Sequence, residues 1–308
     1  MKLQQLRYLC EVANQGLNLS KAAEILHTSQ PGISKQIRLL ENELGVDILV
    51  RNGKRVVEIT PPGRAILEIA ERMLKDTNNL KQVGREFANE ASGSLTIATT
   101  HTQARYALPA AIKHFTARYP KVKLILNQGS PTQIAELVRS GAADIAIATE
   151  AIEFYDELVM LPCYQWNRCI VVPPQHPLLG LGELTLEAIA EHPIITYDFA
   201  FTGRSKINQA FDARGLTPNV VLTAIDSDVI KTYVELGLGV GILAQMAFEP
   251  KRDSHLRVID ASHLFEPSTT RIGISRNSYL RRYVYDFIEI FAPHLDYATV
   301  TSAMKERS

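Results

Sequence analysis

The feature that most constrains this chain is a break between two short helical patterns near residue 30. The first pattern places apolar residues on one helix face, at Ala22, Ala23, Ile25 and Leu26. Ser29 then suits an N-cap, and Pro31 suits the first turn of a new helix. The second pattern stops at Gly45 and repeats apolar residues at helical spacing, at Ile33, Ile37, Leu40 and Leu44. Two short helices joined by a tight turn predict a helix-turn-helix.

The second of these helices carries side chains that suit the major groove of DNA. Glutamine and arginine can make bidentate contacts to base edges, whereas serine and lysine suit phosphate and mixed contacts. The candidate DNA-binding residues of this segment are Ser29, Gln30, Pro31, Ser34, Lys35 and Arg38. Taken alone, this surface fits an ordinary solvated helix face better than a DNA-binding one, and the segment that follows reverses that preference.

The following segment predicts a basic β-hairpin. Residues 48–50 are typical of a strand, Asn52-Gly53 of a tight turn, and residues 56–59 of the returning strand. Basic side chains crowd the turn, at Arg51, Lys54 and Arg55. A basic hairpin directly after a helix-turn-helix is a wing, placed to contact phosphates or to enter the minor groove. We therefore predict that residues 1–60 form a winged helix-turn-helix that binds double-stranded DNA.

A long amphipathic helix is predicted over residues 61–90. Its seam alternates spacings of four and three, at Ile66, Ala70, Met73, Thr77, Leu80, Gly84 and Phe87. This is a heptad seam with two weak positions, Thr77 and Gly84. The seam could pack on its own domain, but its length and its place between two domains favour a contact between subunits. A dimer would also place two recognition helices about one DNA turn, roughly 34 Å, apart.

From residue 91 onward, apolar strand-like runs alternate with helical patterns. Strands are expected at 94–98, 122–126 and 144–148, with helices at 103–119 and 132–139. This β-α-β-α-β order predicts a parallel sheet with right-handed crossovers. A second cycle begins near residues 169–172 and includes a helix at 204–214, a strand at 220–224, a helix at 227–236 and a strand at 241–243.

The expected fold class is therefore α/β, with a winged helix-turn-helix, a linker helix and a two-lobed effector-binding domain of the periplasmic-binding-protein type. Lobe I is expected from residues 91–162 and 268–308, and lobe II from residues 163–267. Ligands of such sheets bind beyond the carboxyl ends of the strands, so we expect a pocket between the lobes.

Polar residues at the predicted strand ends define a candidate effector site. Thr100, Thr102 and Gln103 lie where the first strand runs into a helix, whose free N–H groups and dipole favour an anion. Thr149 ends the third strand at the same edge, and Thr202 precedes a helix in the second lobe. Each threonine alone could be a simple N-cap, but together they favour a site for a small anion or an amino-acid-like molecule.

No pattern in the sequence demands catalysis, a metal or a cofactor, so we expect no enzyme. Gly237-Leu238-Gly239-Val240-Gly241 follows a helix instead of linking a strand to one, and this predicts a tight turn into a buried strand, not a nucleotide loop. The preferred interpretation of His101 is a hydrogen-bonded loop residue. Trp166 could border the pocket, but core packing is preferred for it and for the three cysteines, Cys10, Cys163 and Cys169.

Charge and hydropathy set weaker limits. The formal net charge is zero, but residues 1–64 carry nine basic and six acidic side chains, an excess that permits DNA binding without proving it. No apolar run approaches the roughly 18 residues of a membrane span, and the first residues do not resemble a signal peptide. We therefore expect a cytoplasmic protein with no membrane contact.

The chain resembles LysR-type transcriptional regulators over essentially its whole length to about Leu295. The resemblance rests on residues 29–37, 40–45 and 60–63 at their spacing in this sequence. A narrower resemblance to the CysB-like activators of cysteine-regulon genes rests on five further segments, 99–106, 128–133, 160–168, 201–205 and 228–241. The tail after Leu295 is short and polar, which departs from the longer tails of such relatives.

The narrower resemblance implies further properties. It implies a homotetramer, a dimer of dimers, that activates sulfur-assimilation genes and contacts RNA polymerase. It also implies an acetylserine-type inducer, with sulfate or related anions as other ligands, bound by the five residues of the candidate effector site. Regulation of sulfonate-utilisation genes is an alternative with much the same pattern. A solute-binding protein is an alternative of a different class, against which the N-terminal DNA-binding unit counts.

Overall fold

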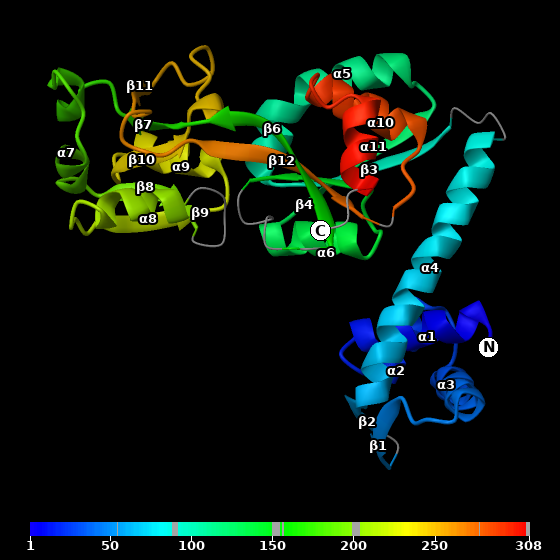
Figure 1. Cartoon of the computed structure of the whole chain (residues 1–308). Helices are drawn as coiled ribbons and strands as arrows, with labels where there is room; N and C mark the ends of the chain where they lie inside the picture. Colours follow the sequence, from blue (N-terminus) through cyan, green and yellow to red (C-terminus); the bar gives the residue numbers. More distant parts are fainter. Residues whose placement is uncertain are drawn as a thin grey trace. The chain divides into compact units, whose positions relative to one another are not determined.

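The computed structural model describes residues 1–53, 55–87, 92–149, 155, 157–198, 204–276 and 278–305 (Figure 1). The chain divides into two compact units, Met1–Ala88 and Asn89–Ser308. The long helix belongs to the first unit, together with the helix-turn-helix and the wing. Among the described residues, no helix is both long enough and apolar enough to span a bilayer, and no three metal-ligating side chains gather at one point.

The first unit has the predicted winged helix-turn-helix fold. Its elements are α1 Leu3–Asn14, α2 Leu19–Ile25, α3 Gln30–Leu44, β1 Leu49–Asn52, β2 Arg55–Ile59 and α4 Pro61–Phe87. The local causes are those expected, because Ser29 Oγ accepts the Gly32 N–H at 3.2 Å and Gly45 ends α3 with a φ of 71°. β1 and β2 pair antiparallel and form the wing.

Two predicted apolar positions of the helix-turn-helix are exposed. Ile33, Ile37 and Leu40 are fully buried as expected, whereas Leu44 is 40% exposed and Ile25 is 46% exposed. Leu44 is the last residue of α3, and the buried stripe of that helix ends before it. Ile25 lies beside the buried stripe of α2, because Leu26, the next residue, is partly buried against the core. The predicted apolar face is therefore too long in α3 and too wide in α2.

The heptad seam of α4 divides into two parts. Ala70 is buried in the core of the first unit, and Ile66 and Met73 are partly buried against that core. Leu80, farther along the seam, is 73% exposed. The first half of the seam thus packs on its own domain, and a contact between subunits remains a prediction for the second half.

The first lobe of the second unit is a five-stranded mixed sheet of order β4-β3-β5-β12-β6. Its strands are β3 Gly93–Thr99, β4 Val122–Gln128, β5 Ile145–Ala148, β6 Leu158–Trp166 and β12 Ser268–Ser275. Its helices are η1 Gln103–Ala107, α5 Leu108–Arg118, α6 Pro131–Arg139, α10 Arg282–Phe291 and α11 Tyr297–Lys305. The predicted parallel pairs are present, β3 with β4 and β3 with β5, while β12 is antiparallel to β5 and β6.

The second lobe has a five-stranded sheet of order β11-β7-β10-β8-β9. Its strands are β7 Arg168–Val172, β8 Ile194–Tyr197, β9 Val220–Ala224, β10 Val240–Ala244 and β11 Arg257–Asp260. Its helices are η3 Pro177–Gly180, α7 Leu186–Ala190, α8 Arg204–Asp212, α9 Ser227–Glu235 and η4 Gln245–Ala247. β8 is parallel to β9 and β10, whereas β7 is antiparallel to β10 and β11.

The strands β6 and β12 carry the chain between the lobes (Figure 1). The predicted lobe boundary at residues 162 and 163 needs correction, because it falls inside β6. This strand stays in the first sheet as far as Trp166, which pairs with Ser268 at the start of β12. β12, the strand on which the chain returns to the first lobe, begins at Ser268.

Three smaller predictions concern a turn, the cysteines and the polar tail. The turn at 237–241 is confirmed, because Gly237 has a φ of 77° and a side chain on Gly239 would lie 2.3 Å from the Pro193 carbonyl oxygen. The cysteines are free thiols whose pKa burial raises to about 12, although Cys163 is only half-buried. The polar tail folds as α11, with Val300 fully buried.

Candidate DNA-binding surface and effector pocket

A groove in the first unit runs between α3 and the wing. It is lined by Leu19, Gln30, Pro31, Ser34, Lys35, Arg38, Leu39, Asn42, Arg51, Gly53 and Val56. The structure thus brings together five of the predicted α3 residues, and Lys35 and Arg38 are exposed there. Ser29 lies outside the groove lining as the N-cap of α3. Helical spacing could also have found Asn42, which follows Ser34 and Arg38 at intervals of four.

The wing arginines have different surroundings. Arg55 is exposed, and Lys54 lies outside the described residues. Arg51 makes a bidentate ion pair with Glu41, with Nη2 to Oε2 at 2.8 Å and Nη1 to Oε1 at 3.1 Å. A guanidinium held in this way fixes the wing to α3. Arg51 also lines the groove, so its DNA contact stays a prediction.

Glu41 is the buried centre of this contact, only 5% exposed. Its Oε1 also accepts the backbone N–H groups of Ile48 at 2.9 Å and Leu49 at 3.0 Å. Burial alone would raise the pKa of Glu41, but the hydrogen bonds from Arg51 and from these N–H groups outweigh it and hold the pKa below its ordinary value. The carboxylate is therefore charged at neutral pH and ties the start of β1 to α3.

The predicted pocket lies at the strand ends of both lobes. Its lining residues are Thr100, Thr102, Gln103, Thr149, Trp166, Tyr197 and Ile225. Four of the five predicted effector residues are among them, and Thr202 lies outside the described residues. The strand ends that meet here belong to β3, β5 and β6 of the first lobe and to β8 and β9 of the second.

Two buried polar atoms of the lining have no hydrogen-bond partner among the described residues. They are Thr149 Oγ1 and Trp166 Nε1. A buried donor without a partner costs roughly 1–3 kcal/mol, so such atoms mark places where a ligand would be stabilised. Trp166 also packs in the core of the second lobe. The preferred prediction of core packing was thus incomplete, because this side chain also borders the pocket.

Gln103 is committed to protein contacts. Its Nε2 donates to Thr270 Oγ1 at 3.0 Å, and its Oε1 accepts the Tyr164 hydroxyl at 2.6 Å. These partners lie on β12 and β6, the two strands that connect the lobes. Gln103 therefore holds the connecting strands together at the pocket floor and has one amide hydrogen left for a ligand.

Two further residues of this region are Tyr197, which lines the pocket, and His101, which precedes Thr102. The fully buried hydroxyl of Tyr197 contacts Ser227 Oγ at 2.7 Å and accepts the Ala244 N–H at 3.1 Å. Burial raises the pKa of Tyr197, so the phenol stays neutral. The loop prediction for His101 is wrong, since this residue begins a helix, and its buried Nδ1 has no partner in the described part of the chain.

The described pocket lining contains no charged side chain and presents hydroxyl, amide and indole groups. Neutral donors at a helix start can hold a small anion through hydrogen bonds alone. Both units of the chain match families of known proteins. Residues 3–64 match the bacterial regulatory helix-turn-helix proteins of the lysR family, and residues 88–296 match the LysR substrate binding domain. The chain belongs to the LysR family.

Several relatives within the LysR family are similar over nearly the whole chain. The HTH-type transcriptional regulator SsuR of Burkholderia cenocepacia is 55% identical to this chain, over 99% of the length of each protein. The HTH-type transcriptional regulator CysB of the same organism is also 55% identical, over 99% of this chain and 97% of its own. Among solved structures, the cofactor-binding domain of the Cbl transcriptional regulator matches 71% of this chain and 96% of its own length. The sequences are 45% identical, and the TM-score is 0.68. The chain is thus a ligand-responsive transcriptional regulator and not an enzyme.

Proposed function

We propose that this LysR-family regulator activates genes of sulfur assimilation and cysteine biosynthesis. An acetylserine-type inducer, sulfate or a related anion is the proposed effector, bound by Thr100, Thr102, Gln103, Thr149 and Thr202. The observation that carries this proposal is the pocket of neutral donors at the strand ends of both lobes. The resemblance to CysB-like activators and the similarity to SsuR and CysB support the choice of genes.

The chemistry of the pocket suits a small oxyanion. Sulfate has only acceptor oxygens at neutral pH, and the hydroxyls of three threonines and the Trp166 N–H can donate to such oxygens. The carboxylate of an acetylserine offers the same acceptors in a larger molecule. A ligand that contacts both lobes would favour one arrangement of the lobes over others and so influence DNA binding.

The proposed DNA contacts are Gln30, Pro31, Ser34, Lys35 and Arg38 in the groove, with Ser29 at the start of α3 and Arg51, Lys54 and Arg55 on the wing. The second half of the α4 seam, where Leu80 is exposed, is the proposed contact between subunits of a dimer. Two dimers would then form a tetramer that acts on RNA polymerase in the cytoplasm. Regulators of the LysR family bind DNA and form oligomers, and this supports the proposed DNA contacts and the proposed tetramer.

The deciding experiment is calorimetry of the full chain with sulfate, thiosulfate and O-acetylserine, followed by gel shifts on promoter DNA of sulfur-assimilation genes. We expect saturable binding of at least one of these ligands and specific DNA binding that weakens steeply with salt. Binding of none of the three would remove the ligand assignment, and salt-insensitive DNA binding would remove the proposed contacts.

A second candidate is regulation of sulfonate-utilisation genes. Its support is that the relatives named SsuR and CysB are equally identical to this chain, at 55%. Competition between labelled promoter DNA of a cysteine-biosynthesis gene and unlabelled promoter DNA of a sulfonate-utilisation gene separates the two candidates. Preference for the sulfonate promoter by tenfold or more, equivalent to about 1.4 kcal/mol, would select the second.

A further inference from the structure

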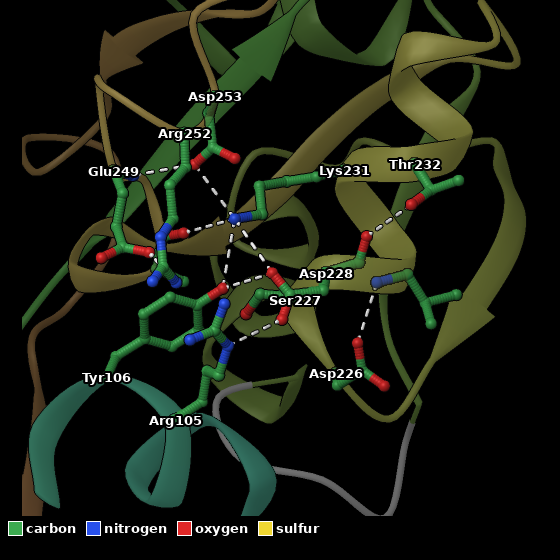
Figure 2. A network of polar contacts seen from close by, with 12 residues as sticks. Arg105, Tyr106, Asp226, Ser227, Asp228, Lys231, Thr232, Glu249, Arg252 and Asp253 are labelled. Carbon is green, nitrogen blue, oxygen red and sulfur yellow. Dashed lines mark hydrogen bonds and ion pairs between the residues drawn. The ribbon is translucent and has the colours of Figure 1, made fainter. Parts of the chain in front are cut away.

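A polar network joins the two lobes beside the effector pocket (Figure 2). Tyr106 belongs to η1 of the first lobe, and Asp228 and Lys231 belong to α9 of the second. The Tyr106 hydroxyl donates to Asp228 Oδ1 at 2.6 Å and accepts from Lys231 Nζ at 3.1 Å. Arg105, next to Tyr106, adds a contact from its Nε to Asp228 Oδ2 at 3.3 Å. We call Arg105, Tyr106, Asp228 and Lys231 the interlobe network.

The second-lobe side of this network is firmly anchored. Lys231 is only 6% exposed, and its ammonium also donates to Asp253 Oδ2 at 3.0 Å and to the Ala247 carbonyl at 2.9 Å. Asp253 in turn accepts the Glu249 N–H at 2.8 Å. Because a buried ammonium is strongly destabilised without partners, these contacts hold Lys231 in one place. Tyr106 therefore meets a fixed acceptor and a fixed donor.

Tyr106 is bound by the second lobe through its ring as well. The ring packs against the core cluster of that lobe, and Lys231 Nζ lies 5.4 Å from the ring centroid. Burial, followed by the hydrogen bond to Asp228, raises the pKa of Tyr106, so the hydroxyl keeps its proton and remains the donor. A first-lobe side chain thus has both its polar and its apolar part held by the second lobe.

The same short segment lines the pocket. Thr100 and Thr102 are lining residues, Gln103 bonds to the connecting strands, and Tyr106 reaches the second lobe. Residues 103–107 form a π-helical turn, a local distortion of helices that is frequent at functional sites. Thr102, Gln103 and the Tyr106 contact therefore lie on one continuous helical stretch.

We propose that Tyr106, supported by Arg105, is a latch that holds the lobes together and limits how often the effector pocket opens. The effector role of the pocket rests on the proposed function, but the latch itself does not. Its strength comes from a hydrogen bond to a charged group in a partly buried place. Loss of such a bond shifts an opening equilibrium by about tenfold or more.

The test is hydrogen exchange of the full chain without added ligand, with Tyr106→Phe and Tyr119→Phe as a matched pair. The Tyr119 hydroxyl also bonds a carboxylate, that of Asp286, but both of these residues belong to the first lobe. We expect amides of η1 and of the first turn of α9 to exchange about tenfold faster in Tyr106→Phe and at the wild-type rate in Tyr119→Phe. Amides of the core strands β7 and β10 should keep their wild-type protection in both variants.

Unchanged exchange at η1 and α9 in Tyr106→Phe would overturn the latch, and so would an equal loss of protection in β7 and β10, which indicates general destabilisation. Asp228→Asn provides a second route, and the double variant should open no more than the more open single variant. Calorimetry with sulfate and O-acetylserine separates the two proposals. If the wild type binds neither, the ligand assignment fails while the ligand-free exchange still decides the latch.

Discussion

Glu41 in the DNA-binding unit and Asp228 in the sensor unit are carboxylates in similar chemical surroundings. Each accepts hydrogen bonds from an arginine, and in each case hydrogen bonds outweigh burial and hold the pKa below its ordinary value. All described partners of Glu41 belong to one packed unit, whereas Asp228 accepts from residues of both lobes. The first arrangement fixes a single geometry, whereas the second belongs to the latch that we propose between the two lobes.

The largest effect is expected at the fixed carboxylate. Glu41→Ala leaves the Arg51 guanidinium and two buried N–H groups without their acceptor, and this should lower the free energy of unfolding of the first unit by about 3–5 kcal/mol. Urea denaturation followed by circular dichroism measures the loss. Glu43→Ala, at an exposed position of the same helix, is the control, and an equal loss there would contradict the special role of Glu41.

The contribution of the Glu41 charge should depend on pH. Its folded-state pKa is lowered, so the stabilisation is complete above the unfolded-state value of about 4.3 and is lost as the pH falls through the folded-state pKa. The stability difference between the wild type and Glu41→Gln should therefore shrink between pH 6 and pH 3. A difference that is constant over this range would mean that the charge contributes nothing.

Substitutions in the pocket should change ligand affinity without changing basal DNA binding. Thr149→Val and Thr102→Ala each remove a hydroxyl donor, and each should weaken binding of an anionic effector by about 1.5–3 kcal/mol. Calorimetry of the full chain measures the effect, with Thr116→Val on the exposed face of α5 as the control. Wild-type affinity in both pocket variants would remove these residues from the site.

Substitutions of the two described wing arginines should have different effects, one on DNA binding and the other on stability. Arg55→Ala should weaken DNA binding for all sequences alike and reduce the salt slope by about one, with unchanged stability. Arg51→Ala should act mainly through stability, because it breaks the ion pair with Glu41. Gel shifts at several salt concentrations, combined with urea denaturation, test this, and a stable Arg51→Ala variant with a reduced salt slope would show that Arg51 acts mainly as a DNA contact.

The smallest effect is expected from Arg105→Ala. The Arg105 and Asp228 side chains are both partly exposed, 40% and 42%, and ion pairs of this kind contribute about 0.2–1 kcal/mol. The exchange rate at η1 should rise far less than in Tyr106→Phe. A larger rise in Arg105→Ala would transfer the main role in the latch from the buried hydroxyl to the exposed ion pair.

Most of the first unit was predictable because its core follows helical spacing. Ile33, Ile37 and Leu40 were found from that spacing alone, and the wing followed from one turn signal between two apolar runs. The errors at Ile25 and Leu44 arose because spacing does not show how wide or how long a helix face the neighbouring elements cover. The pairing of Arg51 with Glu41 was missed, because a buried carboxylate looks like any other polar residue in a sequence.

The pocket was predictable in outline for a topological reason. Strand ends of parallel pairs meet at one edge, so Thr100, Thr102 and Thr149 were expected together. Trp166 and Tyr197 were not assigned to the site, because apolar and aromatic side chains in buried strands give no signal that one edge faces a cavity. The Tyr106 contact with Asp228 joins residues far apart in the sequence, and single-sequence patterns contain no information about such a pair.

Trp166 is an intrinsic fluorescence probe of the pocket. It is the single tryptophan of the chain, and its indole borders the pocket, so tryptophan emission from the whole regulator originates beside the proposed effector. A shift of the emission maximum or a loss of emission intensity on adding a metabolite would therefore report a change in the sensor unit alone, even while promoter DNA is bound. Screening of candidate effectors consequently needs no attached dye.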